Sequence, residues 1–173
     1  MNQVIKAIKS RRSVRKYRPD PVPVDLIQEV MECGKYAPSA RNFKAWQFVA
    51  VTDKDMIEKI RIGSNTSVLM AGWADSFHGA PCIIIVFCDS TVGEPVKDGN
   101  LALQNMMLAA HSLGLGTCYI NVVKQLFDFT IGDEIKKQLG VPAHYMAAGS
   151  ITLGYPAEEG QFTPKNMDCA SIY

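Results

Sequence analysis

The residues best suited to chemistry in this sequence form a basic cluster near its start. The stretch RRSVRKYR, residues 11–18, places four arginines and one lysine in eight positions. Guanidinium groups bind phosphate oxygens through paired hydrogen bonds, and a serine hydroxyl adds a neutral donor. Arg11, Arg12, Ser13 and Arg15 are therefore a candidate phosphate site, with donors converging at i and i+4 in a helix or at i and i+2 in an extended segment. Solvated side chains at a helix end, or a nucleic-acid partner, would explain the same cluster.

The charge of the whole chain argues against nucleic acid. Its 173 residues carry a formal net charge of +1, so no long-range field attracts a nucleic acid or an anionic membrane. Non-specific binding to nucleic acid needs several neutralised phosphates. One short basic cluster on a nearly neutral chain fits one or two phosphate groups better. The cluster therefore indicates either a phosphate site or solvated side chains, and we expect neither nucleic acid nor membrane as a partner.

The histidines and cysteines predict neither a metal site nor a disulfide framework. His78, His111 and His144 are scattered, without the spacing of metal ligands. The five cysteines form no CxxC pair, and the N-terminal residues lack the apolar core of a signal peptide. This pattern predicts reduced thiols and a cytoplasmic location. No segment approaches the roughly 20 apolar residues that a membrane span needs.

Two further stretches could face a ligand, although ordinary connections explain both. In YAPSARNFKAW, residues 36–46, a helix ends and small polar residues lead into a strand. Small side chains let backbone groups approach the edge of a flat ligand. In LGLGTCYIN, residues 113–121, a glycine-capped helix turns into a strand, and nothing there requires a ligand.

The elements that position these stretches follow from apolar periodicity and from prolines and glycines. The chain predicts helices at residues 3–12, 24–36, after an N-cap at Asp53, 100–113 and 132–139, and strands at 47–52, 82–88, 117–122 and 145–153. Residues 63–80 are expected to form a loop or a partial helix. CIIIVFC, residues 82–88, predicts a strand covered on both faces, and the helix at 100–113 is apolar nearly all round. The mixture indicates an α/β or α+β three-layer domain, and no GxGxxG supports a Rossmann site.

Four stretches, in this order along the chain, resemble the nitroreductase family of flavoproteins: RRSVRKY, YAPSARNFKAW, DGNLALQNMMLAAHSLGLGTCYI and ITLGYPAEE. The resemblance covers roughly residues 5–165. It implies one FMN-binding domain over residues 1–173 with an α+β three-layer fold. In that fold helices flank a central, mostly antiparallel sheet, and the C-terminal tail extends onto a partner subunit.

The resemblance also implies a homodimer with FMN in clefts at the subunit interface. NAD(P)H would reduce the flavin, which would pass the electrons to a small acceptor such as a nitroaromatic or a quinone. The flavin performs this chemistry, so no catalytic side chain is expected. Flavin-binding storage or sensing without turnover, and reductive dehalogenation on the same fold, are the alternatives.

The cofactor-binding residues that the resemblance implies come from three parts of the chain and its tail. The phosphate and ribityl side would be held by Arg11, Arg12, Ser13 and Arg15. The partner chain would contribute Pro38, Ser39, Ala40 and Asn42. The backbone position facing flavin N5 would be that of Asn121 and Val122. A basic tail residue, Lys165, would join the phosphate.

The sequence departs from the family pattern at several positions. Many members read NxQPW where this chain has Asn42-Phe43-Lys44-Ala45-Trp46, and Met167 replaces an arginine common after the tail lysine. Residues 63–79 contain no lysine, so an extra phosphate contact seen in larger members is not expected here. Trp73 and Phe77 are expected to be packing residues.

Overall fold

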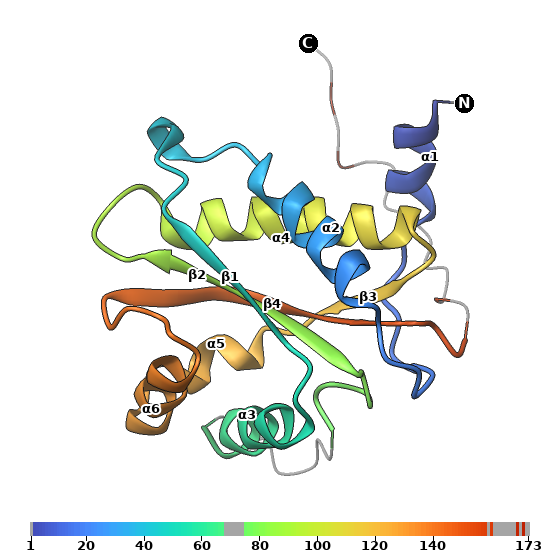
Figure 1. The fold of residues 1–173 in the computed structure, drawn as a ribbon. Coiled ribbons are helices and arrows are strands. Elements are labelled where there is room, and N and C mark those ends of the chain that lie inside the picture. Colours follow the sequence, from blue (N-terminus) through green and yellow to red (C-terminus); the bar gives the residue numbers. More distant parts are fainter. Residues whose placement is uncertain (1, 68–74, 159, 161–168, 170, 172–173) are drawn as a thin grey trace.

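A four-stranded antiparallel sheet with the order β1-β2-β4-β3 forms the centre of the described structure (Figure 1). The structure is a computed structural model that describes residues 2–67, 75–158, 160, 169 and 171. Its strands are β1 (Trp46–Val51), β2 (Cys82–Asp89), β3 (Gly116–Tyr119) and β4 (Tyr145–Gly154). The expected α+β fold with an antiparallel central sheet is thereby confirmed for the described residues.

Helices cover both faces of the sheet and make the three layers. They are α1 (Gln3–Ser10), α2 (Val24–Lys35), the 3-10 turn η1 (Ala40–Asn42), α3 (Lys54–Ser67), α4 (Pro95–Ser112), α5 (Val122–Leu126) and α6 (Thr130–Gln138). One apolar core lies between the sheet and α2 with α4, and a second lies between the sheet and α3, α5 and α6. No helix among the described residues is long and apolar enough to cross a membrane.

The central strand β2 joins the two cores. Ile84 and Val86 belong to the core under α2 and α4, whereas Ile83, Ile85 and Phe87 belong to the core under α3, α5 and α6. Side chains alternate across a strand, so an apolar residue is needed at every position when both faces are covered. The prediction for this strand is confirmed.

Helix α4 begins at Pro95, five residues before the expected start, and packs closely on the sheet. A Cβ on Gly99 would come within 2.3 Å of the Ala148 Cβ, so only glycine permits this approach of helix and strand. Its opposite side is less covered, since Leu101 is 45% exposed. The C-terminal cap at Gly114 is confirmed by its φ of +77°.

Two boundary predictions are wrong, and both affect the candidate site. The strand expected at 117–122 ends at Tyr119, and Val122 begins α5 instead. The buried pair Val123 and Leu126 packs on the sheet, and this i, i+3 contact favours a helical turn over a longer strand. The helix expected at 3–12 ends at Ser10, after which Arg11 has extended backbone angles.

The stretch at residues 63–80 is partly helical, as expected. Helix α3 continues to Ser67, and residues 76–79 form a turn in which Phe77 is buried, which confirms it as a packing residue. Trp73 lies outside the described residues. The N-cap at Asp53 is confirmed, since its carboxylate accepts a hydrogen bond from the Met56 N–H at 2.8 Å.

Candidate functional site

The basic cluster lies on an extended segment that crosses the outer end of the sheet. Because α1 ends at Ser10, residues 11–17 run alongside β3 and the chain that follows β4. Ser13 pairs with Thr117 in a parallel bridge, and the Val14 N–H donates to the Thr117 carbonyl at 2.9 Å. The structure therefore selects the extended alternative, in which side chains two residues apart share a side.

Arg11, Ser13 and Arg15 share one side of this segment, next to the buried thiol of Cys118 on β3. Burial raises the pKa of Cys118, while Arg15, a hydrogen bond from Ser13, and Arg11 act in the opposite direction. All three side chains therefore act on one group at the edge of the sheet, whereas the cavity described below is lined by Arg11, Arg12 and Val14 and not by Ser13 or Arg15. Two cations and a hydroxyl in this arrangement suit the oxygens of one phosphate ester.

The Arg12 side chain lies on the other side of the segment and makes hydrogen bonds within its own chain. Its Nη1 donates to the carbonyls of Lys9 at 2.7 Å and Arg11 at 2.8 Å. The last carbonyls of a helix lack partners within the helix, so this contact caps the end of α1. The sequence did not distinguish Arg12 from its neighbours, because that distinction depends on where α1 ends.

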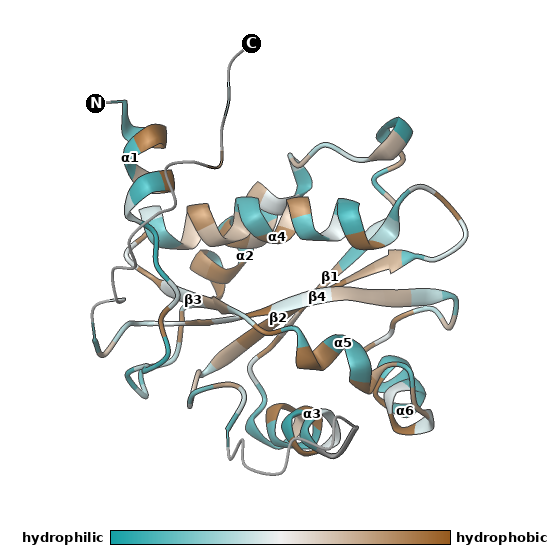
Figure 2. Cartoon of the chain, turned by 180° about the vertical axis from the view of Figure 1, so that it is seen from behind, coloured by the Kyte–Doolittle hydropathy of each residue, from teal (hydrophilic) through white to brown (hydrophobic). Residues whose placement is uncertain are grey.

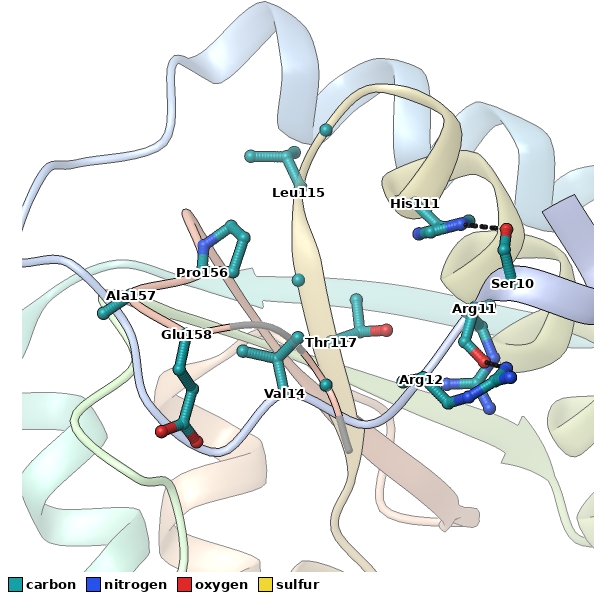
Figure 3. A pocket seen from close by; sticks show the side chains of 13 residues that line it. Ser10, Arg11, Arg12, Val14, His111, Leu115, Thr117, Pro156, Ala157 and Glu158 are labelled. Carbon is teal, nitrogen blue, oxygen red and sulfur yellow. Dashed lines mark hydrogen bonds between the residues drawn. The ribbon is translucent and has the colours of Figure 1, made fainter. Parts of the chain in front are cut away.

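Arg11 contributes an unpaired donor beside a cavity. Its Nη1 is buried and has no hydrogen-bond partner among the residues that the structure describes. The cavity has a volume of about 640 Å³ and lies between the end of α1, the α4–β3 turn and the chain after β4 (Figure 3). An unsatisfied buried N–H costs about 1–3 kcal/mol, so an acceptor such as a phosphate oxygen would be favoured there.

The charge of the cavity is positive at the side where α1 ends. Figure 3 shows Ser10, Arg11, Arg12 and His111 gathered there, with Glu158 at the opposite side. The Ser10 Oγ and the His111 Nε2 are 2.7 Å apart. Burial lowers the pKa of His111 most, and Arg11 and Arg12 lower it further. The wall therefore favours an anion even with His111 neutral.

The second candidate stretch, Pro38, Ser39, Ala40 and Asn42, lies near the start of α4 instead. The Ala40 N–H donates to Asp98 Oδ1 at 2.9 Å, and the Lys44 N–H donates to Ser39 Oγ at 2.9 Å. Arg41, Asn42 and Lys44 have φ values of 50°, 58° and 50°. Such left-handed angles are uncommon outside glycine, so these contacts hold the turn in a costly conformation.

The two groups are separated by the length of α4. Asp98, in the first turn of α4, anchors the Ser39–Ala40 turn, and His111, in its last turn, faces Arg11. Figure 1 shows η1 and α1 at opposite ends of α4. An α-helix rises 1.5 Å per residue, so Asp98 and His111, 13 residues apart on α4, lie about 20 Å apart along the helix axis. One chain therefore does not bring the two groups together.

Asn121 and Val122 lie where β3 passes into α5. Asn121 is exposed, Val122 is half-buried, and the Ile120 carbonyl accepts a hydrogen bond from Ser150 Oγ at 2.8 Å. Asn121 is four residues beyond Thr117, a distance of about 13 Å along an extended chain. A mononucleotide lying along this edge can span the distance between the basic segment and this turn. Lys165 lies outside the described residues.

Sequence reasoning missed two groups beside the basic segment. Tyr17 is buried with Val14 and Ala80 beside the sheet. Its contacts depend on the tertiary structure, so the spacing of the basic cluster did not indicate it. The second group is His78, whose pKa is lowered by burial and by Arg15 but raised by Asp75. Only the tertiary structure places this turn near the segment.

Comparison with known proteins identifies the fold and the family. The model of the nitroreductase family matches residues 8–155. A protein of Methanothermobacter thermautotrophicus, provisionally described as an NADH dehydrogenase/NAD(P)H nitroreductase, is 38% identical over 159 residues, which cover 90% of this chain and 78% of that protein. A Bacillus subtilis FMN reductase [NAD(P)H] is 27% identical over 190 residues, covering 95% of this chain and 70% of that protein.

Crystal structures of two nitroreductases with bound FMN have the same fold. The one from Bacteroides fragilis has a TM-score of 0.88 and 29% identity and covers 100% of this chain and 98% of its own. The one from Desulfitobacterium hafniense has a TM-score of 0.92 and 26% identity and covers 100% of this chain and 99% of its own. With the match of the family model over most of its length, this chain belongs to the nitroreductase family.

Proposed function

We propose that this chain is an FMN-dependent oxidoreductase that passes electrons from NAD(P)H through bound flavin to a small acceptor, such as a nitroaromatic or a quinone. Residues 1–173 would act as one FMN-binding domain. The observation that carries the proposal is the buried, unpaired Nη1 of Arg11 beside a cationic cavity. Relatives named as an FMN reductase and as nitroreductases with bound FMN support the same cofactor.

The residues present fit the phosphate end of FMN. Arg11 would give its unpaired N–H to a phosphate oxygen, and Arg15 and Ser13 lie on the same side of the segment. Arg12 also lines the cavity, with its Nη1 held by backbone carbonyls. We include Arg12 as a phosphate contact because it lines the same cavity, and Lys165 as a tail residue that joins the phosphate.

The flavin end would lie at the turn from β3 into α5. When bound, the isoalloxazine ring accepts a hydride and returns electrons to an acceptor. The chain's own contribution is to orient that ring with backbone groups of Asn121 and Val122 and to anchor the phosphate. A carbonyl held by Ser150 Oγ fixes the backbone directly before this turn. No side chain is required to act as an acid or a base.

We propose that two chains build each site. Pro38, Ser39, Ala40 and Asn42 would come from the partner subunit, because their anchor on α4, Asp98, lies about 20 Å along the helix from His111 at the basic segment of the same chain. The face around α1 supports a homodimer: α1 buries none of its residues, and Val4, Ile5 and Ile8 are 63%, 47% and 54% exposed. Figure 2 shows apolar segments, in brown, along α1. We also propose that the C-terminal tail of each chain extends onto the partner subunit.

An apolar groove continues this exposed face. It has a volume of about 390 Å³ and lies between α1, α2 and α4. Contiguous exposed apolar surface of this kind is typical of subunit interfaces. We also propose a cytoplasmic location, supported by the free thiols of Cys33, Cys82, Cys88 and Cys118.

Anaerobic titration tests the proposed activity directly. The purified protein is loaded with FMN, and its absorbance is followed after addition of NADH or NADPH and then of a nitroaromatic or a quinone. Bleaching by either nicotinamide and recovery with the acceptor are expected. Tight FMN binding without bleaching would instead support storage or sensing, and a protein that takes up no FMN would refute the proposal.

A further inference from the structure

We infer that Tyr17 is a positioning residue for the cofactor phosphate: its hydroxyl fixes the backbone from which Ser13 and Arg15 extend. The inference rests on the proposed function and goes beyond it, because Tyr17 would act through the segment rather than touch the cofactor. Its ring is buried with Val14 and Ala80, and its hydroxyl is used within the protein.

The hydroxyl of Tyr17 fixes one of the two peptide planes around Val14. Each peptide unit is rigid and planar, so binding one of its polar atoms sets the direction of the chain on both sides. The Val14 N–H donates to the Thr117 carbonyl at 2.9 Å, which fixes the plane shared with Ser13. The Tyr17 hydroxyl donates to the Val14 carbonyl at 2.8 Å, which fixes the plane shared with Arg15.

The tyrosine is itself anchored to the sheet. Its oxygen lies 2.7 Å from Thr152 Oγ1, and that oxygen accepts a hydrogen bond from the Cys118 N–H at 3.0 Å. The Thr152 hydroxyl is closer to Tyr17 than to the Cys118 carbonyl, which is 3.3 Å away. Since the single proton of Tyr17 goes to the Val14 carbonyl, the Thr152 hydroxyl would be the donor between Thr152 and Tyr17, and Thr152 links Tyr17 to β3.

The segment around Tyr17 and the tyrosine ring also make contacts that do not involve the hydroxyl. Backbone bonds from Arg18 to the Tyr155 carbonyl and from Ala157 to the Lys16 carbonyl, each 2.9 Å, hold the strand ends without the hydroxyl. A Cβ on Gly154 would lie 2.9 Å from the Tyr17 ring, so the ring fills its space closely. Burial also raises the pKa of Tyr17, which keeps its proton available for donation. Tyr17→Phe thus removes the hydroxyl and retains the rest.

Titration of the apoprotein with FMN, followed by flavin fluorescence, tests this role. Tyr17→Phe is expected to raise the Kd for FMN about three- to tenfold, the effect of one lost hydrogen bond. Tyr119→Phe is the matched control, because it also removes a tyrosine hydroxyl from a hydrogen bond at the sheet, the 3.0 Å contact to Asn100. Its Kd is expected to stay within about twofold of the wild type.

A double-mutant cycle distinguishes positioning from a general loss of stability. If Tyr17 acts through Arg15, Tyr17→Phe should change the Kd less in an Arg15→Ala background than in the wild type. Equal changes in both backgrounds, or an unchanged Kd in Tyr17→Phe, would overturn the inference. Wild-type protein that binds no FMN would refute the proposed function itself. FMN binding that is weakened by Arg11→Ala but not by Tyr17→Phe would refute the inference alone.

Discussion

Replacing Arg11 with alanine should weaken FMN binding without destabilising the apoprotein. The reason is that one atom, the Arg11 Nη1, lacks a partner in the apoprotein and would gain one in the complex. In the apoprotein the Arg11 Nη1 is buried without a partner, so its removal relieves a cost of about 1–3 kcal/mol. In the complex the same atom would bind a phosphate oxygen through a charge-assisted hydrogen bond of about 1.5–3 kcal/mol. The substitution should therefore raise the Kd for FMN about 10- to 150-fold.

The assay combines an FMN titration with thermal unfolding of the apoprotein and a measurement at His111. The free energy of unfolding is expected to be unchanged or higher. Arg11 lowers the pKa of His111, so the pKa of this imidazole, followed by NMR, should rise in the variant. Arg18→Ala is the control, because it removes an exposed arginine of the same cluster that pairs with Asp20. A variant with lower apoprotein stability and unchanged Kd would show that Arg11 is a structural side chain and would refute the reasoning.

The remaining predictions concern pH and the dimer. His78 and His111 have pKa values lowered mainly by burial, so between those values and the ordinary value of about 6.5 the unfolded chain binds more protons than the folded one. The free energy of unfolding should be highest above about pH 6.5 and should fall as the pH drops below that value. Urea unfolding of the apoprotein at several pH values would measure it, and a free energy that does not change with pH would contradict the prediction. Ile5→Glu places a charge on the exposed face of α1 and should shift the protein from dimer to monomer in sedimentation experiments and weaken FMN binding, whereas a stable dimer with unchanged affinity would exclude this face. Mixed dimers of an Arg11→Ala chain and an Ala40→Trp chain should bind about one FMN tightly, because one of the two shared sites would carry both substitutions and the other neither. If both sites bind FMN weakly, Arg11 and Ala40 of the same chain belong to one site, which would contradict the shared arrangement.

Apolar pattern alone predicted the parts of the fold that depend on burial. The run at 82–88 is apolar on both sides because two helix layers cover it, and no other short element explains such a run. Val122 shows where the pattern fails. Val122 and Val123 are β-branched and favour a strand, but burial of Val123 and Leu126 on the sheet makes this stretch the helix α5. A choice of this kind depends on tertiary contacts, which periodicity does not contain.

The candidate site depended on one boundary that the sequence left open. A helix continuing through residue 15 would have placed Arg11 and Arg15 one turn apart on one helix face. The extended segment instead groups Arg11 with Ser13 and Arg15, and it turns Arg12 back toward the α1 carbonyls. The sequence supplied the residue types and the helix end supplied the geometry. The role of Tyr17 followed from the geometry alone.

The length of α4 gives a physical reason for the proposed dimer to have twofold symmetry. Each chain presents its basic segment at the C-terminal end of α4 and its Ser39–Ala40 turn near the N-terminal end. A twofold axis across the middle of α4 would set two such helices antiparallel, with each turn beside the partner's basic segment. One interface would then complete two equal sites, and the apolar side chains left exposed on α1 and at Leu101 of α4 would be buried by the same operation. In a head-to-tail dimer only one basic segment would meet a partner's Ser39–Ala40 turn, and the remaining segment and turn would have no counterpart. The twofold dimer, which completes both sites, is therefore favoured.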